Sequence, residues 1–158
     1  MIVEWKAGSD MAEGPTKSFE VRWDDTDLNG HLRNTRYLEY AATARLALLV
    51  DAGWPPRALV KAGVAAVSLG EEVRYLREVF PLDTVTVTTR LVGLSADRGR
   101  WRFEHTFTRE DGEEAAVVRT LGAWIDLRAR RITEPPAGLR LTLEEARADD
   151  CELITSRR

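Results

Sequence analysis

Residues 22–53 read RWDDTDLNGHLRNTRYLEYAATARLALLVDAG, and this stretch decides the fold. It opens on strand-like residues that end at Trp23, continues as a short polar loop and closes as a helix. Asn34 or Thr35 is expected to cap the first free N–H groups of that helix. Gly53 and the two prolines that follow it are expected to stop the other end.

The helix is predicted to lie closely against a sheet. Its four alanines make one side slim, and its charged residues Arg36, Glu39 and Arg45 are predicted to face solvent or a partner. At ~1.5 Å per residue it spans about 27 Å, longer than a usual strand, so that one sheet could wrap it. Apolar residues at roughly helical spacing form the predicted inner face: Leu38, Ala41, Ala42, Leu46, Leu49 and Val50.

The loop before the helix gathers carboxylate, amide and imidazole groups. Three Asp, two Asn and one His lie within the eleven positions 24–34. Free N–H groups at a helix N-terminus carry partial positive charge and stabilise an anion or a developing oxyanion. A carboxylate there can deprotonate a water or attack a carbonyl directly. We therefore expect the chemistry of this protein in the loop.

The rest of the chain predicts an antiparallel sheet. One strand precedes the helix (16–23), and four follow as a meander over 64–79, with Gly70 at a bulge, then 83–94, 101–108 and 115–127. Residues 54–63 connect helix and sheet, with room for one short turn of helix. His105, among Trp101, Phe103 and Phe107, is interpreted as a core or interface histidine. The fold class is therefore α+β, a five-stranded sheet around one central helix in the order β-α-β-β-β-β.

The composition indicates one globular domain over residues 1–158. Its core is expected at about 16–128, after a lead-in over 1–15 and before a proline-containing segment with a short terminal helix over 129–158. Thr142 and Glu145 are interpreted as a capping box for that helix. The net charge of −3 argues against nucleic acid as the main partner. The single Cys151 excludes an internal disulfide framework.

No apolar run reaches the ~20 residues of a membrane span, and the start lacks the apolar region of a signal peptide, so a cytoplasmic location is expected. One sheet on one helix leaves an uncovered face and open edges. The sequence therefore predicts a homodimer, with a dimer of dimers as the larger possibility.

Other interpretations of the loop remain open to different degrees. Simple capping and turn formation by Asp and Asn is the plainest one. Residues 25–30 match the first half of an EF-hand loop, but Arg33 and Arg36 occupy the later ligand positions, which opposes calcium. His31 lacks a second histidine at ligand spacing, so no metal is expected. The G-x-S-x-G elbow of serine hydrolases is absent.

The run Trp23-Asp-Asp-Thr-Asp27-Leu-Asn-Gly30-His-Leu-Arg-Asn34-Thr-Arg-Tyr37-Leu-Glu-Tyr resembles the signature of hotdog-fold acyl thioesterases of the 4-hydroxybenzoyl-CoA thioesterase type. Val73-Arg-Tyr75-Leu-Arg, Pro81-Leu-Asp83 and Asp111-Gly112 fall where that family places its second strand, a turn and a hairpin. The resemblance implies a hotdog fold from about Phe19 to Leu127. It also implies a dimer with the two sheets joined edge to edge and the sites at the interface.

The resemblance implies Asp27 as catalytic base or nucleophile and the backbone N–H near Asn34 as the group that binds the thioester oxygen. Asn29, His31 and Asn34 also resemble the D-x-N-x-H-x-x-N run of plant-type acyl-ACP thioesterases, which implies assisting roles for them. The further downstream acidic or cysteine residue of those enzymes has no clear counterpart. Glu71 and Glu72 are the nearest candidates, and a solvated strand is the plainer interpretation of both.

The resemblance implies hydrolysis of an acyl-CoA or acyl-carrier-protein thioester, with no cofactor beyond the coenzyme A or phosphopantetheine of the substrate. Arg90, Arg128, Arg130 and Arg131 are candidates for binding the CoA phosphates, against a solvated basic turn as the alternative. The rival functions are a non-catalytic acyl-CoA-binding protein, a hydratase or dehydratase on the same fold, and a structural dimer module. Which acyl group the protein accepts depends on the shape of the pocket.

Overall fold

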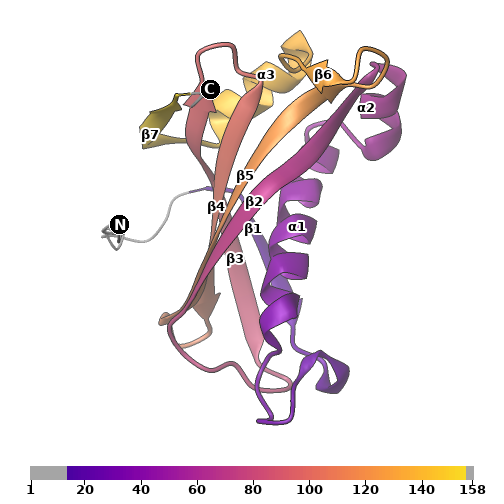
Figure 1. Ribbon diagram of the computed structural model, residues 1–158. Coiled ribbons are helices and arrows are strands. Elements are labelled where there is room, and N and C mark those ends of the chain that lie inside the picture. Colours follow the sequence, from indigo (N-terminus) through magenta and orange to yellow (C-terminus); the bar gives the residue numbers. More distant parts are fainter. Residues whose placement is uncertain (1–13, 156–158) are drawn as a thin grey trace.

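A computed structural model describes residues 14–155 and has one long helix, α1 (Asn34–Asp51), along the inner face of a curved sheet (Figure 1). The main strands follow the order β1-β3-β4-β5-β2 with antiparallel pairing throughout. This confirms the predicted α+β hotdog architecture, one strand, one long helix and four strands. The strands are β1 (Thr16–Glu20), β2 (Val64–Tyr75), β3 (Thr84–Ser95), β4 (Arg100–Arg109) and β5 (Glu114–Asp126).

The connector and the bulge in β2 agree with the predictions. A short helix, α2 (Pro56–Lys61), lies between α1 and β2, and the β2–β5 register shifts between Ser68 and Gly70. β2 ends at Tyr75, four residues earlier than predicted, and the chain then crosses to β3 through a turn at residues 81–82. Residues 1–13 of the predicted lead-in lie outside the part of the chain that the structure describes.

The C-terminal part holds more structure than predicted. A two-residue strand, β6 (Arg131–Ile132), pairs with β5, and β7 (Arg147–Ile154) pairs in parallel with β3. The predicted capping box was wrong, because α3 (Ala137–Glu145) begins after Pro136 and buries Thr142 in its second half. β7 was missed because its sequence RADDCELI carries four charged residues and only weak alternation.

The first strand also ends earlier than predicted. The chain leaves β1 after Glu20 and forms a 3₁₀ turn, η1 (Trp23–Asp25), that leaves Trp23 80% exposed. The backbone N–H of Arg22 donates to the Asp25 carboxylate at 3.0 Å. This local hydrogen bond turns the chain where alternation alone predicted a continuing strand.

The buried face of α1 is rotated from the prediction. It is made by Tyr37, Tyr40, Ala41, Ala44 and Leu49. The prediction was right for Ala41 and Leu49, and Leu38 packs partly buried against the core. It was wrong for Ala42, Leu46 and Val50, which are exposed. The rings of Tyr37 and Tyr40 fill the space between helix and sheet. The prediction considered aliphatic residues at helical spacing and therefore overlooked these tyrosines.

The predicted side-chain cap of α1 was also wrong. Arg33 is the N-cap residue and makes no side-chain cap hydrogen bond, while Asn34 is already the first helical residue. The N–H of a first helical residue has no carbonyl acceptor within its own helix. The start of α1 therefore presents at least one N–H group that is available to a ligand.

Two hydrophobic clusters fill the space between helix and sheet. One gathers around Tyr37, Val87 and Phe107, and the other around Trp101, Trp124 and Leu139. Gly122 faces Trp101 across the β4–β5 ladder, and a Cβ at that position would lie 2.1 Å from the indole. The absence of a side chain at Gly122 therefore makes room for Trp101.

A buried polar group of side chains lies on the inner face of the sheet beneath α1. The Nη1 atom of Arg45 lies 3.1 Å from Nε2 of His105, and the other ring nitrogen lies 3.1 Å from the Thr89 hydroxyl. Arginine has only donors, so Nε2 accepts and Nδ1–H donates to Thr89. The expectation that Arg45 faces solvent or a partner was wrong, and the expectation of a core histidine at 105 is confirmed.

This arrangement keeps His105 neutral. Burial and the nearby Arg45 guanidinium lower the pKa of His105 to about 3. The unfolded chain binds a proton at this residue below about pH 6.5, whereas the folded chain does not. Stability from the neutral histidine is therefore fully present above pH 6.5 and is lost as the pH falls toward the folded value.

We predict that the free energy of unfolding falls by about 1.4 kcal/mol per pH unit from His105 alone between pH 6 and 5. Urea unfolding at several pH values measures this slope. In a His105→Gln variant, which keeps a neutral hydrogen-bonding side chain, the slope over the same interval is expected to be nearly absent. Equal slopes in the two proteins would contradict a buried neutral histidine.

Candidate active site

The loop between η1 and α1 is held by hydrogen bonds among its own residues. The Asp27 carboxylate accepts the Asn29 N–H at 2.8 Å, and the Asp27 carbonyl accepts the Gly30 N–H at 3.0 Å. Gly30 has φ +73°, a conformation that favours glycine. The Asp27 N–H donates to the His31 carbonyl at 3.0 Å and closes the loop. The result is a tight turn that presents Asp27 and His31.

Asp25 fixes this loop to the helix. Its carboxylate is 5% exposed, accepts the Tyr40 hydroxyl at 2.8 Å and lies 2.8 Å from Nε of Arg36. Its backbone carbonyl accepts the Arg33 N–H at 2.9 Å. Tyr40 in turn stacks on Phe19 of β1, with ring centroids 4.4 Å apart. One buried carboxylate therefore connects β1, the loop and the first turns of α1.

The charged form of Asp25 is favoured in the folded chain. Burial by itself raises the pKa of this carboxyl, but the hydrogen bonds from Tyr40 and the Arg22 N–H, with the charges of Arg36 and Arg22, hold it below its usual value. Its contribution to stability is present above the unfolded pKa near 3.8 and is lost as the pH falls through the lower folded value.

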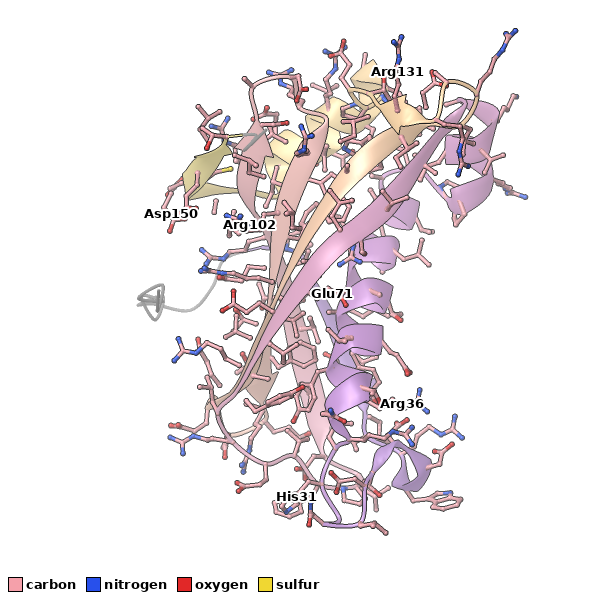
Figure 2. The ribbon with its side chains drawn as sticks, in the orientation of Figure 1. His31, Arg36, Glu71, Arg102, Arg131 and Asp150 are labelled. Atoms are coloured by element: carbon pink, nitrogen blue, oxygen red, sulfur yellow. The ribbon has the colours of Figure 1, made fainter. Side chains whose placement is uncertain are left out.

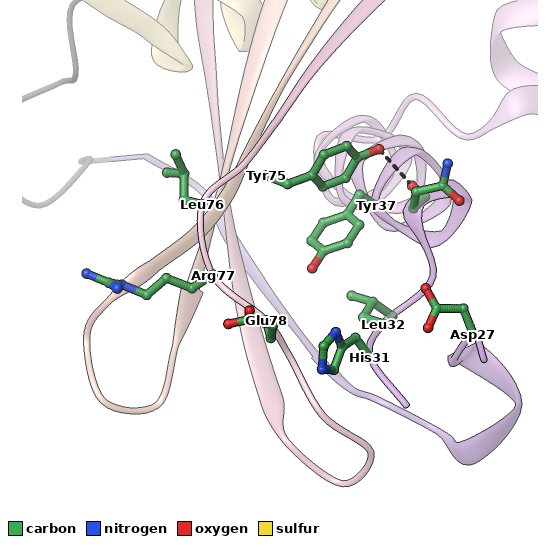
Figure 3. A pocket seen from close by; sticks show the side chains of 9 residues that line it. Asp27, His31, Leu32, Tyr37, Tyr75, Leu76, Arg77 and Glu78 are labelled. Atoms are coloured by element: carbon green, nitrogen blue, oxygen red, sulfur yellow. Dashed lines mark hydrogen bonds between the residues drawn. The ribbon is translucent and has the colours of Figure 1, made fainter. Parts of the chain in front are cut away.

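A cavity of about 290 Å³ opens between the start of α1 and the end of β2 (Figure 3). Asp27, His31 and the first helical residue, Asn34, all line it. The His31 ring meets Phe80 edge to face at 5.1 Å between centroids. The side chains that line the cavity belong to Asp27, His31, Leu32, Asn34, Tyr37, Tyr75, Leu76, Arg77 and Glu78.

The cavity brings a carboxylate and a helix N-terminus together. Asn34 receives a hydrogen bond on its carbonyl from the Tyr75 hydroxyl at 3.4 Å, which joins β2 to the helix start. The exposed N–H end of a helix polarises a carbonyl oxygen and stabilises the oxyanion that forms when the carbonyl is attacked. A carboxylate within the same cavity supplies a base or nucleophile for that attack.

Three of the four predicted catalytic residues share this cavity: Asp27, His31 and Asn34. Asn29 is exposed on the loop and does not line the cavity, and its backbone N–H holds the Asp27 carboxylate. Their catalytic roles stay predictions. Glu71 and Glu72 lie on exposed parts of β2, outside the residues that line the cavity.

The four arginines predicted for CoA phosphates are not gathered at this cavity within one chain. Arg90 forms an ion pair with Glu104 at 2.6 Å and lines a different, smaller cavity. Figure 2 places Arg131 at the opposite end of the molecule from His31. Arg128 and Arg130 are exposed in the turn that leads to it. Phosphate binding by these residues stays a prediction.

The sequence analysis missed six of the nine residues that line the cavity: Leu32, Tyr37, Tyr75, Leu76, Arg77 and Glu78. The two tyrosine rings meet edge to face at 5.3 Å. Both tyrosines lay within the runs that carried the family resemblance, so a signal was present. They are 38 positions apart in the sequence, which gave no indication that Tyr37 of the helix and Tyr75 of the strand would meet.

Within residues 14–155, no cluster of three or more His, Cys, Asp or Glu side chains is arranged to hold a metal ion. Over the same residues, none of the helices combines the length and apolar character needed to cross a membrane.

Known proteins are similar to this chain in sequence and in fold. A protein from Agrobacterium fabrum named L-carnitine dehydrogenase/betainyl-CoA thioesterase is 33% identical over 145 residues, which cover 90% of this chain and 29% of that protein. The chain thus spans less than a third of the length of this relative.

Solved structures share the fold at lower identity. A 1,4-dihydroxy-2-naphthoyl-CoA thioesterase from Synechocystis superposes with a TM-score of 0.75 at 17% identity, over 82% of this chain and 95% of that one. A hypothetical protein from Staphylococcus aureus, solved in complex with CoA, superposes with a TM-score of 0.78 at 18% identity, over 96% and 94% of the two chains.

The sequence also matches a protein family over residues 21–143, which include the loop, α1, the cavity wall and all of β2 to β5. With a loop carboxylate at the start of the central helix and a hotdog sheet around it, this chain belongs to the thioesterase-like superfamily.

Proposed function

We propose that this protein hydrolyses an acyl-CoA thioester to a carboxylic acid and free coenzyme A. The observation that supports the proposal is a single cavity lined both by Asp27 and by Asn34, the first residue of α1. Membership of the thioesterase-like superfamily supports it, as does a relative named for thioester hydrolysis. An acyl-carrier-protein thioester, which presents the same phosphopantetheine arm, is the alternative substrate.

The proposed reaction uses these two groups, the Asp27 carboxylate and the Asn34 N–H. A water loses its proton to Asp27 as its oxygen attacks the thioester carbon, and the Asn34 N–H stabilises the oxyanion that forms. Collapse of this intermediate breaks the C–S bond, and the thiolate takes up a proton. In the alternative route the Asp27 carboxylate itself attacks, and water then hydrolyses the resulting anhydride. His31 and Asn29 assist by positioning the water and the loop.

A non-catalytic acyl-CoA-binding protein would bind the thioester without releasing thiol. A hydratase or dehydratase would change the acyl chain and leave the thioester intact. Release of free thiol therefore separates the proposed activity from both rivals.

We predict that Asp27→Asn lowers kcat by a factor of about 10² to 10⁴ with little effect on stability, because Asp27 is exposed and its carboxylate is removed from the reaction. Thiol release from a panel of acyl-CoA thioesters, betainyl-CoA included, measures the effect. Asp24→Asn, which changes a carboxylate of the same loop that does not line the cavity, is the matched control. Activity of the Asp27 variant close to wild type would remove the assignment.

We also propose that the chain works as a homodimer joined along β2. Within the described residues β2 pairs only with β5, so its other edge is free, and most of its side chains are exposed. Tyr75 lies on this strand, 53% exposed, and lines the cavity. A second copy placed along the edge would pair the free backbone groups and add a wall to the cavity.

Sedimentation equilibrium at micromolar concentration is expected to give twice the chain mass of 17.8 kDa. Leu69→Lys places a charge on the free strand and is expected to shift the protein toward monomer. Leu153→Lys, at another exposed leucine on β7, is the matched control and should leave the dimer intact. A wild-type mass of one chain would contradict the dimer.

A further inference from the structure

Two tyrosine rings form one corner of the active-site cavity. Tyr37 comes from α1 and is 4% exposed, whereas Tyr75 comes from the free strand β2 and is 53% exposed. Their planes are inclined by 73° with centroids 5.3 Å apart, so the rings meet edge to face. Both line the cavity, and the part of the cavity beside them is here called the recess (Figure 3). Aromatic faces carry negative electrostatic potential and attract cations that approach them.

Two carboxylates border the same recess. Asp27 lies at the helix start, and Glu78 lies on the segment after β2, beside Tyr37 in Figure 3. Burial first, and then Tyr75, Glu78 and Asp27, raise the pKa of the Tyr37 hydroxyl to about 12. The fields of both carboxylates therefore converge at this tyrosine.

Neither carboxylate has a cationic partner. No ion pair of Asp27 or Glu78 is found among residues 14–155. Arg77, the one arginine or lysine among the described lining residues, pairs with Glu113 at 2.8 Å and extends to the other side of the strand in Figure 3. Arg109 lies close to Glu78 and donates to its backbone carbonyl at 3.1 Å, but its guanidinium pairs with Asp111 at 2.9 Å. The two carboxylates of the recess therefore keep no ion-pair partner of their own among the described residues.

A neutral acyl group would be a poor occupant of this recess. An apolar group would displace water from the two carboxylates and offer them nothing in return, which is costly. A small cation would satisfy both the carboxylates and the aromatic faces. The volume of about 290 Å³ lies at the low end for ligand pockets, which favours a compact acyl group.

We propose that the acyl group accepted here is short and carries a permanent positive charge, such as a quaternary ammonium, held by the faces of Tyr37 and Tyr75 and by the Glu78 carboxylate. This inference rests on the proposed thioester hydrolysis. It assigns Tyr75 and Glu78 as residues that determine acyl specificity, beside the Asp27 that acts on the carbonyl.

An isosteric pair of substrates tests the charge alone. Trimethylammonioacetyl-CoA (betainyl-CoA) and 3,3-dimethylbutanoyl-CoA have the same shape, with a positively charged nitrogen in one replaced by a neutral carbon in the other. Thiol release from both is measured with the full chain at low and moderate salt. The expected kcat/KM is at least about tenfold higher for the charged ester, since cation–aromatic contact and carboxylate attraction act together.

Two variants test whether Glu78 and Tyr75 determine the preference for the charged ester. Glu78→Gln is expected to reduce the preference for the charged ester at least about threefold, chiefly through a higher KM for that ester. Glu72→Gln removes an exposed carboxylate of β2 that does not line the cavity, and it should keep the wild-type preference. Tyr75→Leu, which keeps an apolar side chain without an aromatic face, is expected to reduce the preference as well.

The outcomes separate the two proposals. Hydrolysis of both esters with similar efficiency, or faster hydrolysis of the uncharged one, overturns the inference and leaves thioester hydrolysis standing. A charged-ester preference that Glu78→Gln and Tyr75→Leu both leave intact overturns the assigned binding site. Thiol release from neither ester, nor from any other acyl-CoA of the panel, overturns the proposed function, and the inference falls with it.

Discussion

The candidate active site depends on the hydrogen bonds and the ion pair of the buried Asp25 carboxylate. It accepts hydrogen bonds from Tyr40 and from the Arg22 backbone, and it pairs with Arg36. Hydrogen bonds to a charged group contribute about 1.5–3 kcal/mol each, more than neutral ones. Because these partners come from both sides of the loop, the loop has one position relative to the helix start. The cavity exists because that position is fixed.

Asp25 and Asp27 are two positions apart and have opposite environments. The first is buried, with every partner supplied by its own chain, whereas the second is exposed at the edge of a cavity. The first therefore serves the structure, whereas the second accepts one hydrogen bond, from the Asn29 N–H, and stays exposed at the cavity. The loop can keep its shape while the Asp27 carboxylate takes part in a reaction, because Asp25 carries the structural role.

The sequence predicted the central helix and the five main strands, and it predicted chemistry in a loop that borders the cavity. Gly53, the prolines after it and the change to a period of two marked α1 and the meander, and the density of Asp, Asn and His marked the loop. It did not distinguish the two aspartates by burial. That difference arises from Tyr40, fifteen positions further on, whose hydroxyl reaches back across the loop.

Other errors have the same origin in tertiary contacts. Arg45 carries a charge and was predicted at the surface, yet it reaches the sheet and meets His105 and the Trp101 ring. β7 forms although its sequence is polar, because the edge of β3 offers free backbone groups. The cavity wall was hidden because Tyr37 and Tyr75 meet only after β2 folds back along the helix.

The central claim is that one cavity aligns a carbonyl between Asp27 and the first N–H of α1. A crystal structure with an acyl-CoA ketone analogue, in which a methylene group replaces the thioester sulfur, tests it most directly. The account predicts the ketone oxygen within hydrogen-bond distance of the Asn34 N–H and the carbonyl carbon facing the Asp27 carboxylate. An analogue bound with its carbonyl elsewhere on the protein, away from both groups, would contradict it.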